Sequence, residues 1–149
     1  MVEPPANFVL ERGGYPLLSN VYDARIPSMH GVVAVTRPYL EQHRETALAF
    51  LKGYVETLGV IQRDKELAKR VLSQRTNTTD DDILERSWQI YVGQMTDAPF
   101  TSSAGVGTVL EQRAADLPAA RDARPEQFID ERLIRELEAS GFVREHLRR

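Results

Sequence analysis

The spacing of apolar residues predicts a chain that is helical over most of its length. Across residues 44–60 apolar side chains recur every three or four positions, with charged residues on the opposite side, so this segment is expected to be the main amphipathic helix. Its apolar positions are Ala47, Leu48, Phe50, Leu51, Tyr54, Val55 and Leu58. Only residues 31–36, with the sequence GVVAVT, favour a strand, because they are β-branched and apolar on both faces. We expect this strand to be buried and covered by helices.

Capping residues predict where the helices before residue 96 begin. Thr36 can cap a short helix with a proline in its first turn, and Asp64 can cap a helix that ends near Thr76. That helix is expected to bury Leu67, Ala68, Val71 and Leu72. Thr79 is expected to cap the next helix, which runs to about Met95. Its apolar stripe comprises Leu84, Trp88, Tyr91 and Met95.

The C-terminal third is expected to contain two further helices joined by a linker. Ser102 or Ser103 can cap a helix with apolar positions at Val106, Val109, Leu110, Ala114 and Leu117. Residues 117–125 contain two prolines and predict the linker. A helix over residues 131–140 is expected to bury Leu133, Ile134 and Leu137. Gly141 stands where a left-handed cap is needed, and Phe142 can fold back as its apolar contact.

Composition narrows the class of protein. The 149 residues allow about one domain, and the formal net charge of −3 argues against a nucleic-acid partner. Cysteine is absent, which excludes disulfides, thiolate metal sites and cysteine nucleophiles. The longest clearly apolar run, residues 32–35, is far shorter than the ~20 residues that span a bilayer. The N-terminus has no signal-peptide pattern, so the chain as written is expected to stay in the cytoplasm.

Residues that could catalyse a reaction or bind a metal or ligand are scattered along the sequence. His30, His43 and His146 do not follow a metal-binding spacing, and no catalytic motif is present. The acidic run of residues 80–82 favours complementation of a helix dipole over a metal site. The roles of two residue pairs stay open. Gly105 and Gly107 could bind a phosphate or start a helix. Trp88 and Tyr91 could stack on a ligand or pack in the core. A loop at residues 25–31, just before the predicted strand, could expose backbone amides to a ligand or simply connect two elements.

The order of several segments resembles a known family. These segments are ERGGYPLL at residues 11–18, IP at 26–27, GVVAVTR at 31–37, AFLKGYVE at 49–56, PEQFID at 125–130 and LEASGF at 137–142. Together they resemble the C-terminal half of periplasmic substrate-binding proteins of ABC transporters, in the type II group that binds sulfonates, taurine, nitrate and thiamine-pyrimidine precursors.

The resemblance implies a helix-dominated α/β fold. We expect a single domain over residues 1–149 that forms part of a periplasmic-binding-protein-like lobe, with about five or six helices and a sheet of about one to three short strands. Residues 1–30 would be a crossing or loop region, and residues 31–149 the strand plus helices. Relative to the family, the signal sequence and the N-terminal half are missing, so the chain is interpreted as a fragment, a split subunit or a decayed relative.

The resemblance also implies a function without chemistry. The chain would be a solute-binding component of an ABC-type transporter, or a fragment of one, that holds a small organic molecule or anion, is not an enzyme and needs no cofactor or metal. The positions that match cleft or crossing segments are Glu3, Pro4, Ser28, Met29, His30 and Gly31. Expected partners are the ligand, a membrane permease and its ATPase, and either a second copy of the chain or a complementing N-terminal half. The resemblance places the protein in the periplasm or another extracytoplasmic compartment.

Two alternatives remain beside this function. One is an enzyme of the same fold that resembles a thiamine-pyrimidine-precursor synthase, and the other is a free-standing helical interaction module that has lost ligand binding. In either case we expect Phe50, Leu51, Tyr54 and Leu58 to pack over the strand at residues 32–35. That strand has too few companions to occupy both of its edges, which predicts self-association or a requirement for a partner.

Overall fold

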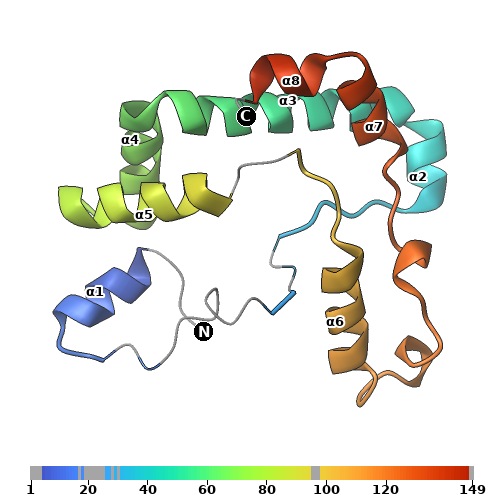
Figure 1. Cartoon of the computed structure of the whole chain (residues 1–149), viewed down its shortest axis with the longest axis horizontal. Coiled ribbons are helices and arrows are strands. Elements are labelled where there is room, and N and C mark those ends of the chain that lie inside the picture. The colour runs from blue at the N-terminus through green and yellow to red at the C-terminus, as the bar shows by residue number, and fades with distance from the viewer. Residues whose placement is uncertain are drawn as a thin grey trace.

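The computed structural model describes residues 5–16, 18, 26–27, 29, 31–94 and 98–147, and within these ranges every regular element is a helix (Figure 1). The α-helices are α1 (Ala6–Arg12), α2 (Arg37–Gln42), α3 (Arg44–Arg63), α4 (Lys65–Thr76), α5 (Asp81–Gln94), α6 (Ser103–Arg113), α7 (Arg132–Ala139) and α8 (Phe142–His146). The short 3₁₀ helix η1 (Pro118–Ala120) lies within residues 117–125, which were expected to be a linker, and a second one, η2 (Pro125–Gln127), begins at the last residue of that segment. None of the described helices is long and apolar enough to cross a bilayer.

The expected α/β fold is wrong for the described part of the chain, which contains no strand. Residues 31–36 have no regular secondary structure, and the side chains of Val32 and Val33 are 64% and 62% exposed. A two-sided apolar strand needs neighbours to satisfy its backbone groups and cover its side chains, and the described residues offer none. The β-branched pattern therefore marked a segment that stays outside the core.

Local capping signals were more reliable. The side chains of Thr36, Asp64 and Ser102 accept hydrogen bonds from backbone N–H groups in the first turns of α2, α4 and α6, as expected. At α5 the prediction was one residue early, because Asp80 and not Thr79 accepts from the N–H of Ile83, at 3.2 Å. These contacts depend on residues close in sequence, so they form whatever the tertiary arrangement.

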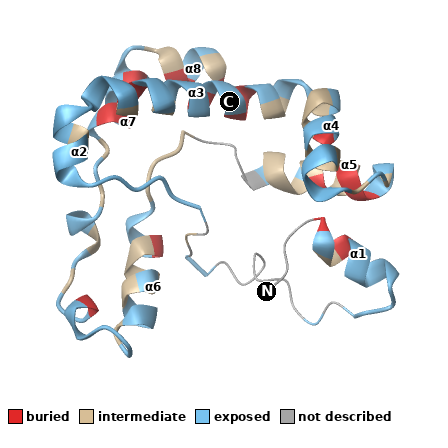
Figure 2. Cartoon of the chain, turned by 180° about the vertical axis from the view of Figure 1, so that it is seen from behind, coloured by how far each residue is buried: buried red, intermediate tan, exposed pale blue. Residues whose placement is uncertain are grey.

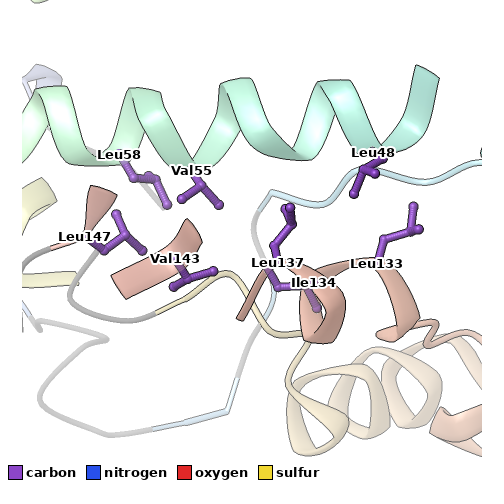
Figure 3. Packing of buried hydrophobic residues seen from close by; sticks show 8 residues of the cluster. All are labelled: Leu48, Val55, Leu58, Leu133, Ile134, Leu137, Val143 and Leu147. Atoms are coloured by element: carbon purple, nitrogen blue, oxygen red, sulfur yellow. The ribbon is translucent and has the colours of Figure 1, made fainter. Parts of the chain in front are cut away.

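The main core lies where α7 and α8 pack against one side of α3 (Figure 3). Leu48, Val55, Leu58, Leu133, Ile134, Leu137, Val143 and Leu147 form its buried cluster. The three residues of α7 in this cluster confirm the burial expected for that helix. Figure 3 shows the side chains of α3 pointing toward those of α7 and α8, so the core is a helix-on-helix contact.

The expected packing of α3 over residues 32–35 is wrong. Leu58 is buried and Leu51 packs against the core, but Phe50 and Tyr54 are 51% and 40% exposed. These two residues lie on a different side of α3 from Leu48 and Val55, because they are one, two, five or six positions away from them and such positions do not share a helix face. α3 therefore has one apolar side in the core and another that faces outward.

Two glycines allow the C-terminal helices to approach α3. Gly141 adopts a left-handed conformation with φ of 83° between α7 and α8, as the sequence predicted. Gly59 lies on α3 beneath the end of α8, and a Cβ atom at this position would overlap the carbonyl oxygen of His146. The Nη1 atom of Arg63 donates a hydrogen bond to that same oxygen at 2.5 Å. A residue without a side chain is needed where the backbone of α8 meets α3.

A second, smaller packing unit consists of α4 and α5. Ile83, Leu84 and Ser87 of α5 are buried, and the hydroxyl of Ser87 donates to the carbonyl oxygen of Ile83 at 2.6 Å. The burial predicted for Val71 is wrong, since this residue is exposed, and Lys69 is buried in α4. Buried positions gather at the contact of α3 with α7 and at that of α4 with α5, while much of the remaining ribbon is exposed (Figure 2). A chain of this size therefore leaves much of its apolar surface uncovered.

Candidate docking surface

The residues that the family resemblance marked for ligand contact do not form a described site. Glu3, Pro4, Ser28 and His30 lie outside the described residues. Met29 is half-buried, and Gly31 is exposed with open space around it. That these residues form one ligand site therefore stays a prediction.

The most conspicuous surface near these positions is the extended segment of residues 31–35. No backbone hydrogen bond joins it to another described residue, whereas Thr36 at its end already accepts one from the N–H of Leu40 in α2. Val35 is exposed like Val32 and Val33. The segment thus presents β-branched side chains together with unpaired backbone groups, which is the combination that extended peptides use to dock on another polypeptide.

An apolar depression lies between α1 and the end of α4. It has a volume of about 390 Å³, is open to solvent, and is lined by Pro5, Ala6, Val9, Leu10, Thr76 and Thr78. Ligand sites usually enclose most of their ligand between opposing walls. Because this depression is open to solvent, a small molecule bound there would keep much of its surface in water.

Charged side chains connect α4 to α5. Lys69 is buried except for a small part, and its Nζ atom lies 2.6 Å from Asp81 Oδ1 and 3.3 Å from Glu85 Oε2. Lys65 Nζ also reaches Glu85, at 3.2 Å. The two lysines are four residues apart, and so are the two carboxylates. Residues with this spacing share a helix face, which was the signal in the sequence that could have located the cluster.

Opposite charges stabilise the ionised forms of this cluster. The hydrogen bond to Asp81, followed by the one to Glu85, raises the pKa of Lys69 above its ordinary value against the effect of desolvation. Desolvation acts to raise the pKa of Glu85, but hydrogen bonds from Lys65, Lys69 and Gln89 together outweigh it and lower that pKa. Both shifts favour the charged forms of Lys69 and Glu85. The cluster therefore connects α4 to α5.

The acidic run of residues 80–82 lies at the start of α5, as predicted from the sequence, and its carboxylates also form ion pairs. Arg12 forms ion pairs with Asp80 and Asp82, and Arg86 pairs with Glu11 at 3.0 Å. The guanidinium of Arg86 also lies 4.0 Å from the ring centroid of the buried Phe8. These contacts attach α1 to α5. No group of three or more potential metal ligands occurs among the described residues.

The other candidates from the sequence have contacts typical of structural residues. Trp88 donates its indole N–H to the carbonyl oxygen of Ile61 at 2.9 Å, which joins α5 to α3. Gly105 donates its N–H to the capping Ser102. His146 stacks on Phe142, with ring centroids 4.1 Å apart, and His43 lies beside Tyr39 at the start of α3. These residues are not gathered into one site.

No family model, curated protein or solved structure matched the chain, so comparison with known proteins identifies no relative. The surface of residues 31–35 is therefore the best-supported candidate for a functional contact.

Proposed function

We propose that this chain is a docking part of a solute-binding component of an ABC-type transporter, and that it holds a small organic molecule or anion only together with a second segment. The observation that carries the proposal is the exposure of residues 31–35, which are apolar, extended and without backbone partners among the described residues. The second segment would be the complementing N-terminal half suggested by the family resemblance. It would cover these residues and supply the opposing wall of the ligand site.

Two physical arguments support the need for a second segment. Exposed β-branched side chains and unpaired backbone groups favour association with another polypeptide. Two depressions on the described surface are open to solvent, the one between α1 and α4 and a second of about 320 Å³ beside Lys69 and Arg70. A ligand bound there would keep most of its surface in water and would gain little affinity.

The first test uses the chain alone in isothermal titration calorimetry against taurine, nitrate and a pyrimidine. The proposal predicts no binding tighter than roughly 10 μM, which corresponds to about −7 kcal/mol. Submicromolar binding of any of these ligands by the chain alone would refute the requirement for a second segment.

The second test is co-expression with the polypeptide encoded immediately before Met1. The proposal predicts a stable one-to-one complex that binds a ligand of the same panel. Val33→Lys should weaken the complex at least tenfold because it places a charge in the contact, and Leu117→Lys, at another exposed apolar position, should not. A complex that tolerates Val33→Lys would exclude residues 31–35 as the docking surface.

The helical interaction module is the second candidate, and it is favoured by the purely helical character of the described residues. It predicts that the chain binds no ligand of the panel, with or without the upstream polypeptide. The synthase-like alternative receives no residue assignment from the contacts described above. Ligand binding by the complex thus distinguishes transport from a purely scaffolding role.

A further inference from the structure

Residues 31–36 form an exposed stretch of backbone that leads into α2 (Figure 1). All six residues are exposed, and the backbone of residues 31–35 forms no hydrogen bond with another described residue. Thr36, which ends the stretch, has extended φ and ψ angles of −73° and 151°. Another protein could therefore bind this backbone without breaking a backbone hydrogen bond of the described fold.

The side chains of this stretch suit one class of protease. An endoprotease binds its substrate as an extended chain, with a pocket for the side chain that precedes the bond to be cut. A small apolar pocket accepts alanine or valine, and residues 32–35 are all of these two types. The next basic residue, Arg37, lies in the first turn of α2 and precedes Pro38, which has no N–H group. The stretch therefore fits a small apolar pocket better than a pocket for arginine.

Other exposed alanines have the right side chain but a different backbone. Ala115 is exposed, yet the N–H groups of the two residues after it, Asp116 and Leu117, both donate to the carbonyl oxygen of Arg113, at 3.1 and 2.8 Å. Ala119 is exposed but lies within the 3₁₀ helix η1. A protease must open such turns before it can bind this backbone in an extended form. The sequence offers several similar sites, and the structure favours residues 31–36 among them.

We infer that residues 31–36 are a cleavage site for serine endoproteases with a small apolar pocket, and that the first cut in the folded chain falls between residues 32 and 36. The cut hydrolyses one peptide bond, so one water is consumed and a new carboxyl group and a new amino group form. It separates α1 from a product that contains α2 to α8. The main core and the unit of α4 and α5 both lie in this product, which therefore stays folded. The inference concerns the free chain and does not rest on the proposed function.

Limited digestion of the full chain with pancreatic elastase, followed by mass spectrometry of the intact products, locates the first cut. Synthetic peptides of residues 30–38 and 111–119 measure how fast each sequence is cut without the fold. Relative to its own peptide, the folded chain should be cut at residues 32–36 at least tenfold faster than after Ala115. A first cut after Ala115 or Ala119 would overturn the inference, and so would equal relative rates at the two sites.

Substitution of the site and a study of the product complete the test. The combined variant Val33→Asp, Ala34→Asp and Val35→Asp places charges where the pocket needs small apolar side chains, and its first cut should be at least tenfold slower. The matched control is Val71→Asp, at an exposed valine within α4, which should be cut at the parent rate. The product with α2 to α8 should keep its helical circular dichroism and unfold cooperatively in urea. Unchanged cleavage of the combined variant, or an unfolded product, would refute the inference.

Discussion

Replacing Gly59 with alanine should destabilise the protein, although alanine is the better helix former. At an unobstructed position the change stabilises a helix by about 0.5–1 kcal/mol. At Gly59 the new Cβ atom would overlap the carbonyl oxygen of His146 and lie 2.9 Å from Nη1 of Arg63. Forcing extra volume into a packed contact costs about 1–3 kcal/mol, and displacing α8 also weakens the hydrogen bond from Arg63. We expect a net loss of about 1–2 kcal/mol.

Gly53→Ala provides the matched control, because it lies six residues earlier in the same helix and has open space around it. This variant should be more stable than the parent by about 0.5–1 kcal/mol. Urea unfolding followed by circular dichroism at 222 nm, at ~1 μM protein, measures both changes without a contribution from self-association. If Gly59→Ala is as stable as Gly53→Ala, α8 does not pack on α3 as described and the argument fails.

Three further predictions concern the core, a cap and pH. Leu137→Ala should lower the free energy of unfolding by about 2–5 kcal/mol in urea titrations, while the exposed Leu117→Ala should change it by less than about 0.5 kcal/mol. Asp80→Ala should cost about 1 kcal/mol in the same assay, and an equal effect of Thr79→Ala would contradict the observed cap. The lowered pKa of Glu85 means that its contribution is present above its ordinary pKa of 4.5 and is lost as pH falls through the folded value. Unfolding measured at pH 7 and pH 3 should therefore show a smaller acid-induced loss for Glu85→Gln than for the parent.

The sequence alone was sufficient to predict features that depend on residues close to one another along the chain. The caps at Asp64 and Ser102 and the left-handed Gly141 were predicted because each acts within one helical turn. The burial of Leu137 followed from the narrow apolar stripe of α7, which has only one possible core side.

Features that depend on distant partners were not predictable in the same way. The β-branched, apolar pattern of residues 31–36 indicates that the segment would fit into a sheet, but it does not indicate whether neighbouring strands exist. The apolar residues of α3 were assigned to one side of the helix, although Leu48 and Phe50 belong to two sides with different surroundings. Of the predicted ligand positions, only Met29 and Gly31 are described, and neither has a contact that indicates a ligand.

Because α3 has two apolar sides, the described residues can form a core and still expose apolar surface. Leu48, Val55 and Leu58 are covered by α7 and α8, so the core forms without residues 31–35 or the exposed side of α3 that carries Phe50 and Tyr54. A helix with one buried side gains most of its stability from that side and does not need the other for folding. Phe50 and Val33 therefore contribute little to the isolated fold while exposing apolar area. Substitutions at these two positions should leave folding intact, so variants at either position can test association with another polypeptide without loss of the fold.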